Sequence, residues 1–90
     1  MTEHLIASAT KLGMPKEQAT RLATQTCLGA GKMLVESSDP PAQLRKNVTS
    51  PNGTTHAALQ TFESLDFEGI VDKSVQAANN RAIELGASLG

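Results

Sequence analysis

Apolar residues recur every three or four positions along most of this 90-residue chain, and this spacing constrains its fold more than any other feature. Such a spacing places side chains on one face of an α-helix, which has about 3.6 residues per turn. Segments rich in proline or glycine interrupt the pattern, and no run alternates between apolar and polar residues as a half-buried strand does. The sequence therefore predicts an all-α fold, a helical bundle with long antiparallel helices.

The interruptions divide the chain into five expected helices. The first starts at Thr2, a candidate N-cap, and ends before Gly13, a common stop signal. The second starts at Pro15, a residue suited to the first helical position, and ends near Ser37. The other three are expected over residues 41–47, 55–65 and 67–85, with Ala58, Leu59 and Phe62 facing inward and a frayed tail over residues 86–90.

The composition indicates that one copy of the chain is a weak folding unit. Phe62 and Phe67 are the only aromatic residues, and the apolar residues are mostly alanine and leucine. Each buried methylene contributes only about 0.8 kcal/mol, so an alanine-rich core stabilises little. A second copy of the chain is the simplest partner. Gly29 and Gly31, inside the second helix, predict close helix packing; a phosphate-binding loop there lacks a preceding strand and the required spacing.

Charge and cysteine content exclude several classes of protein. The net charge is −1 and the basic residues are scattered, which argues against nucleic-acid binding. No apolar run approaches the ~20 residues of a membrane span, and the N-terminus does not have the pattern of a signal peptide. Cys27 is the only cysteine, which fits a reducing, cytoplasmic location. His4 and His56 lie too far apart to suggest a metal site, and none is expected.

The stretch SPNGTT, residues 50–55, is the one candidate site. Pro51 fixes its own φ, and Asn52-Gly53 is a strong turn dipeptide directly before a helix. The backbone N–H groups of Gly53, Thr54 and Thr55 are then expected to point outward together at the positive end of that helix, where they can bind a carboxylate. The alternative is structural: Thr54 caps the helix and Asn-Gly only makes the bend. The residues alone leave both interpretations open.

The same stretch carries a resemblance to a known family. Residues 48–59, VTSPNGTTHAAL, resemble the V-T-S-P-G-G-T-T signature, followed by a helix, of pyrroline-5-carboxylate reductases. Asn52 departs from it, since it stands where the first glycine usually lies. Other segments resemble the family in the same order along nearly the whole chain: KLGMP at 11–15, TQT at 24–26, GAGKML at 29–34 and RAIELG at 81–86.

The resemblance implies that residues 1–90 are the C-terminal helical dimerisation domain of such a reductase. Family members reduce 1-pyrroline-5-carboxylate to L-proline, the last step of proline biosynthesis, and their helical domains interlock as a homodimer that in many members assembles into a decamer. NADPH or NADH is bound mainly by an N-terminal Rossmann domain outside this chain, so we expect no cofactor-binding residue here and no activity from the chain alone. The alternative function is a stand-alone helical dimerisation or interaction module without catalysis.

The resemblance also assigns roles in the loop. Substrate binding is expected from Ser50, Asn52, Gly53, Thr54 and Thr55, whose N–H groups around residues 53–55 hold the substrate carboxylate. The Thr55 hydroxyl is expected near the ring nitrogen and is the candidate catalytic group. The neighbouring His56 is interpreted as a surface or interface residue, because the matching position in the family is often apolar.

Overall fold

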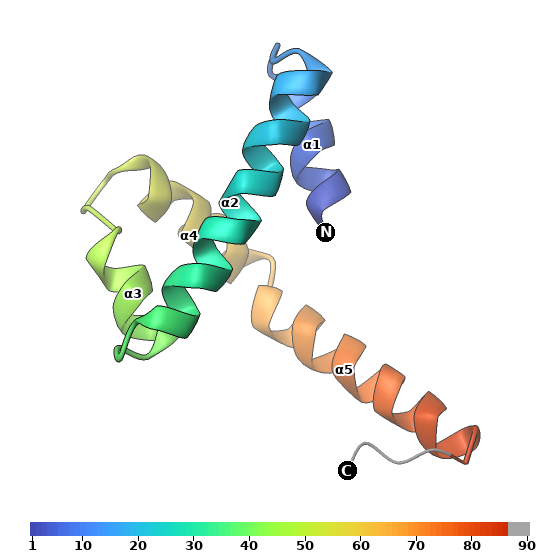
Figure 1. The fold of residues 1–90 in the computed structure, drawn as a ribbon. Helices are drawn as coiled ribbons and strands as arrows, with labels where there is room; N and C mark the ends of the chain where they lie inside the picture. Colours follow the sequence, from blue (N-terminus) through green and yellow to red (C-terminus); the bar gives the residue numbers. More distant parts are fainter. Residues whose placement is uncertain (87–90) are drawn as a thin grey trace. The chain divides into compact units, whose positions relative to one another are not determined.

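The computed structural model describes residues 1–86, which form helices and no strand, as the periodicity predicted (Figure 1). No helix in this part of the chain is both long enough and apolar enough to span a bilayer. Of the frayed tail expected over residues 86–90, residues 87–90 lie outside the described residues. The helices are α1 (Thr2–Lys11), α2 (Lys16–Glu36), α3 (Pro41–Asn47), α4 (Thr54–Ser64) and α5 (Phe67–Glu84).

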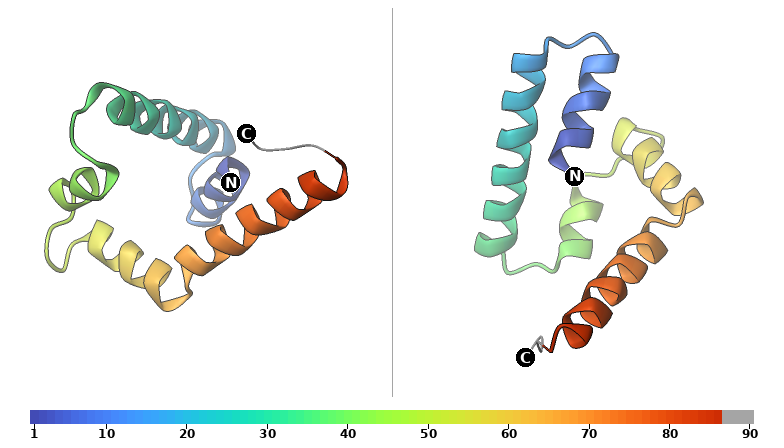
Figure 2. Two further views of the ribbon diagram at one scale, coloured as in Figure 1. Left: turned by 90° about the horizontal axis from the view of Figure 1, so that it is seen from below. Right: turned by 90° about the vertical axis from the view of Figure 1, so that its right-hand side faces the viewer.

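The described chain divides into two compact units, with the boundary after Arg45, inside α3. In the first unit α1 runs antiparallel to the N-terminal half of α2 (Figure 2). The turn between them is a Schellman motif: the Met14 N–H donates to the Ala9 carbonyl at 3.1 Å, and the Gly13 N–H donates to the Thr10 carbonyl at 3.0 Å. Gly13 has a φ of 106°, which explains why glycine ends α1 as predicted.

Three expected helix starts were wrong by one residue. Met1, rather than Thr2, is the N-cap of α1. Pro15 is the N-cap of α2 instead of its first residue, because its ψ of 139° lies outside the helical range while its carbonyl accepts from the Ala19 N–H at 2.9 Å. The helix expected over residues 55–65 begins at Thr54 and ends at Ser64.

The second unit contains α4 and α5, joined by a sharp turn at Leu65 and Asp66. The rings of Phe62 and Phe67 stack across this turn with centroids 4.7 Å apart. Asp66 has a φ of 56° and caps α5, because its Oδ1 accepts from the Gly69 N–H at 3.2 Å. A Cβ on Gly69 would overlap the Asp66 carboxylate, so glycine at this position leaves room for the cap.

A single copy buries very little. Ala19, 2% exposed, and Ala23, 8% exposed, are the only buried residues among those described, and both lie on α2. The inward positions expected on α4 are not buried in one chain: Leu59 is half-buried, while Ala58 and Phe62 are exposed. The reason is that so few helices pack together in one chain that they cannot enclose each other's apolar faces. Large apolar side chains stay exposed on both long helices: Leu22, Leu28, Met33, Leu34 and Val35 on α2, and Ile70, Val71, Val75 and Ile83 on α5.

The glycines of α2 have no close neighbour within the described chain. A Cβ added at Gly29 or at Gly31 would meet nothing within 4 Å. The close packing predicted from these residues is therefore not made inside one copy, and it stays a prediction for contact with another chain. Both residues lie in the interior of α2, and no strand precedes them in residues 1–86, so the phosphate-loop alternative finds no support.

Candidate functional site

The SPNGTT stretch begins with a β-turn over residues 50–53. The Gly53 N–H donates to the Ser50 carbonyl at 3.0 Å and closes the turn. Proline occupies the second position, and Asn52 at the third position has a φ of 62°. Proline followed by a residue of positive φ is the combination typical of a type II turn. Asparagine adopts this backbone conformation more readily than most non-glycine residues, so the turn forms although Asn52 replaces the glycine of the signature.

Glycine at position 53 is required for a different reason. Its φ is −85° and its ψ is −177°, an extended conformation open to any residue. A Cβ at this position would lie 3.2 Å from the Ser50 carbonyl oxygen, which is closer than an ordinary contact. Gly53 therefore permits the close approach of two backbone segments, while the unusual dihedral angle belongs to Asn52.

The start of α4 leaves three backbone N–H groups without a protein acceptor. Gly53 is the N-cap, and its carbonyl accepts from the Ala57 N–H at 3.1 Å. No side chain caps the helix, so the interpretation of Thr54 as the cap was wrong. Because the Gly53 N–H already donates within the turn, the three N–H groups expected to be free are shifted by one residue along the chain. In the described part of the chain, nothing accepts from the N–H groups of Thr54, Thr55 and His56.

The hydroxyls of Thr54 and Thr55, which no described residue engages, differ from most other threonine hydroxyls of the helices. Thr55 is half-buried, and its hydroxyl has no hydrogen-bond partner among residues 1–86. Five other helical threonines donate the hydroxyl to the carbonyl four residues earlier, which removes it from further chemistry. This is the case for Thr10, Thr20, Thr24, Thr26 and Thr61.

The electrostatics at the start of α4 favour an anion. The helix carries a partial positive charge at its N-terminus, and no acidic residue lies in its first turn to compensate that charge. Three free N–H donors and a free hydroxyl are therefore grouped at one helix end without any charged side chain. This arrangement can hold a carboxylate and offer a neutral hydroxyl to an adjacent polar atom.

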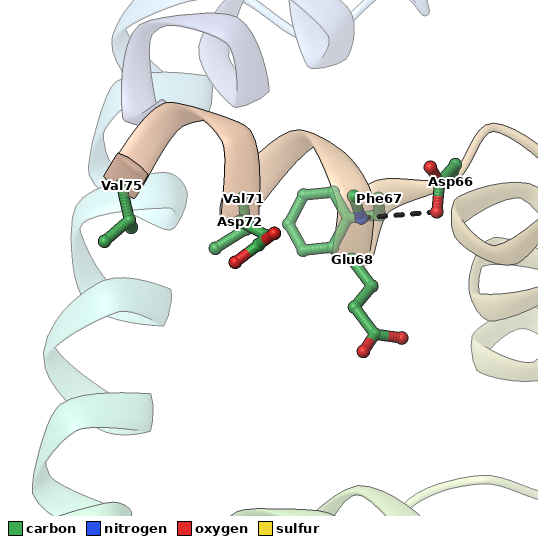
Figure 3. A pocket seen from close by; sticks show the side chains of 7 residues that line it. Asp66, Phe67, Glu68, Val71, Asp72 and Val75 are labelled. Atoms are coloured by element: carbon green, nitrogen blue, oxygen red, sulfur yellow. Dashed lines mark hydrogen bonds between the residues drawn. The ribbon is translucent and has the colours of Figure 1, made fainter. Parts of the chain in front are cut away.

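A concavity lies along the first turns of α5, apart from the SPNGTT loop (Figure 3). Phe67, Val71 and Val75 form its apolar strip, which Glu68 and Asp72 flank. The Gly69 N–H is already bonded to Asp66, and carboxylates of Asp66, Glu68 and Asp72 line this surface, so its negative charge disfavours an anion. Residues 1–86 contain no grouping of three histidine, cysteine or acidic side chains that could hold a metal ion.

Comparison with known proteins identifies the family. A family model described as pyrroline-5-carboxylate reductase dimerisation matches residues 1–85. The chain belongs to this family. The resemblance read from the sequence is thereby confirmed over nearly the whole chain, and the stand-alone interaction module is the less favoured interpretation.

Individual pyrroline-5-carboxylate reductases match the same region. The chain is 49% identical to the reductase of Pseudomonas aeruginosa over 80 residues, which cover 89% of the chain and 29% of that protein. It is 43% identical to pyrroline-5-carboxylate reductase 3 of Xenopus laevis over 84 residues, or 93% of the chain and 31% of that protein. The chain thus spans about a third of the length of these relatives.

Solved structures share the fold. The Plasmodium falciparum pyrroline carboxylate reductase with NADP bound matches with a TM-score of 0.91 and 32% identity, over 96% of this chain and 33% of that one. A pyrroline-5-carboxylate reductase from Coxiella burnetii matches with a TM-score of 0.89 and 44% identity, over 93% of this chain and 31% of that one. The all-helical arrangement of this dimerisation domain is therefore the one that these reductases have.

Proposed function

We propose that this chain is the dimerisation and substrate-binding part of an enzyme that reduces 1-pyrroline-5-carboxylate to L-proline with NADPH or NADH. Membership of the dimerisation family supports the proposal, as does the match to proteins named as reductases. The observation that carries the substrate site is the start of α4, where the N–H groups of Thr54, Thr55 and His56 have no acceptor in the described chain. The cytoplasm, where cysteine stays reduced, is the proposed location.

The cofactor does not fit the residues of this chain. A dinucleotide site of the common kind needs a strand, a glycine-rich turn and a helix, whose N-terminus holds the pyrophosphate. The described residues form no strand, and Gly29 and Gly31 lie inside α2 rather than in a turn. A full-length reductase would accordingly bind NAD(P)H through residues outside this chain, and the roles derived below concern only the substrate.

The turn and the start of α4 make different contributions to binding the substrate carboxylate. Ser50, Asn52 and Gly53 form the type II turn that fixes where α4 begins. The helix dipole and the N–H groups that follow Gly53 provide the attraction and the donors for the anion. A carboxylate bound there accepts hydrogen bonds from N–H donors that no protein group engages. The interaction is therefore favourable without a cationic side chain.

The Thr55 hydroxyl is the proposed partner of the ring nitrogen. It lies on the same first turn as the free N–H groups, and it is not engaged by a carbonyl of its own helix. A donor fixed near the imine nitrogen orients the ring and stabilises the form in which that nitrogen gains a proton. Threonine is too weak an acid to act as a free proton source, so water supplies the proton.

The burial pattern supports the proposed homodimer. Leu34, 50% exposed, and Val75, 60% exposed, are typical of the large apolar residues of α2 and α5. Fully burying one such side chain contributes about 1.5–3 kcal/mol, so a second copy that covers several of them stabilises the fold substantially. Light scattering at micromolar concentration should report twice the mass of one chain. A monomer that unfolds cooperatively would contradict the dimer.

The proposed catalytic role is tested by Thr55→Ala in the full-length reductase. Loss of the hydroxyl should lower kcat by about 5- to 150-fold, equivalent to about 1–3 kcal/mol, because water replaces a neutral donor only in part. Thr55→Ser is the matched control: it retains the hydroxyl and should keep most of the activity. Equal losses in both variants would show that the methyl group, rather than the hydroxyl, matters at this position.

A further inference from the structure

Asn52 is unique among the asparagines of this chain in being followed by glycine. Asn47 precedes a valine, Asn79 precedes another asparagine, and Asn80 precedes an arginine. The carbonyl carbon of an asparagine side chain can be attacked by the backbone nitrogen of the next residue. A glycine in the next position makes this attack easiest, because no β-carbon shields the nitrogen.

The local structure separates Asn52 further from the other three. Asn52 is exposed and lies in the turn, outside any helix. The N–H of the next residue, Gly53, donates one hydrogen bond, to the Ser50 carbonyl at 3.0 Å. Asn79 and Asn80 lie within α5, where the following N–H groups belong to a continuous helical ladder, and Asn47 is the last residue of α3. Opening a single turn is easier than unwinding the interior of a helix.

We propose that Asn52 is a site of spontaneous deamidation, with water as the only co-reactant. The Gly53 nitrogen bonds to the Asn52 Cγ and loses its proton; the bond from Cγ to Nδ2 breaks and ammonia leaves, giving a five-membered succinimide. Water then opens the ring. Cleavage of the bond between that nitrogen and Cγ gives aspartate, and cleavage on the main-chain side gives isoaspartate. Each event replaces a neutral amide with a carboxylate.

The product changes the start of α4 in two ways. Aspartate at position 52 places a negative charge beside the free N–H groups of Thr54, Thr55 and His56. Isoaspartate also lengthens the main chain by one carbon, which displaces the hydrogen bond from the Gly53 N–H to the Ser50 carbonyl. On the proposed function, which this consequence assumes, the new carboxylate competes with the substrate carboxylate for the same donors. Deamidation therefore acts as a slow, irreversible loss of substrate affinity.

The chemical step is tested on the purified chain without reference to activity. Samples held for days in mildly alkaline and mildly acidic buffer are digested and analysed by mass spectrometry, and isoaspartate is measured with an isoaspartyl methyltransferase. The mass increase for exchange of an amide for an acid should appear in the peptide containing Asn52, faster in the alkaline sample, while peptides containing Asn47, Asn79 and Asn80 stay unchanged. Asn52→Gly should abolish it. An unmodified Asn52 peptide, or equal modification of the other asparagines, overturns the proposal.

The consequence is tested on the full-length reductase. Ageing the enzyme should raise KM in step with the modified fraction, and fresh Asn52→Asp should raise KM about tenfold or more, because a like charge beside a bound anion strongly disfavours it. Aged Asn52→Gly enzyme should keep its initial KM. If Asn52 deamidates while Asn52→Asp leaves KM unchanged, the effect on binding is refuted. A fresh enzyme that does not reduce 1-pyrroline-5-carboxylate would instead refute the proposed function and leave the chemical step intact.

Discussion

The cap at Asp66 gives a quantitative test of how the second unit is built. Asp66 serves α5 in three ways: it adopts a φ of 56°, its Oδ1 accepts from the Gly69 N–H at 3.2 Å, and its charge lies at the positive end of the helix. Asp66→Asn keeps the first two and loses only the charge, which is worth about 0.3–1 kcal/mol. Asp66→Gly keeps the backbone conformation but loses the side-chain cap as well, and should cost slightly more than the asparagine variant.

Asp66→Ala removes all three contributions. Loss of the cap costs about 1 kcal/mol, and alanine in the left-handed conformation costs about 1–2 kcal/mol. With the lost charge, the free energy of unfolding should fall by about 2–4 kcal/mol. The measurement is urea unfolding followed by far-UV circular dichroism, at one fixed protein concentration because folding is coupled to association. An alanine variant as stable as the asparagine variant would refute this account of the turn.

Gly69→Ala provides a matched control. Its β-carbon would overlap the Asp66 carboxylate and displace the cap, which offsets the gain of about 1 kcal/mol that alanine brings to a helix. In the Asp66→Gly background no carboxylate is present to displace, so the same substitution should stabilise the protein by about 1 kcal/mol. A Gly69→Ala effect of equal size in both backgrounds would show that the two residues are not coupled.

Further predictions concern the SPNGTT loop. Asn52→Ala should lower the free energy of unfolding by about 1 kcal/mol, because the φ of 62° disfavours alanine, while Asn52→Gly should not destabilise; denaturant titration distinguishes them. Gly53→Val should raise KM for 1-pyrroline-5-carboxylate in the full-length enzyme, since the β-carbon of valine crowds the Ser50 carbonyl and distorts the turn. An unchanged KM would show that the geometry of the turn does not affect substrate binding. His56→Ala should leave kcat and KM nearly unchanged, because the proposed contribution of this residue is its backbone N–H, which alanine keeps. If it abolishes activity while Thr55→Ala does not, the catalytic side chain has been assigned wrongly.

The sequence by itself determined the helical architecture and supplied the candidate site. The spacing of apolar residues and the breaks between the periodic segments predicted every helix, because both are local properties of the chain. Gly13 marked the end of α1 through its freedom to adopt positive φ. The motif around residues 50–55 identified the family before any comparison, and the match over residues 1–85 confirmed it. The cap at Asp66 was not predicted, although an aspartate directly before an apolar helix is a known start signal.

Only the tertiary structure decided how the site is arranged in detail. Whether Gly53 or Thr54 occupies the N-cap depends on where the turn closes, and a shift of one residue moves the free N–H groups from Gly53–Thr55 to residues 54–56. The division of roles between Asn52, which supplies the positive φ, and Gly53, which allows the close approach, likewise depends on backbone geometry. Burial differs most from the sequence expectation, because an apolar residue at a helical spacing shows which face is apolar but not whether its own chain covers that face.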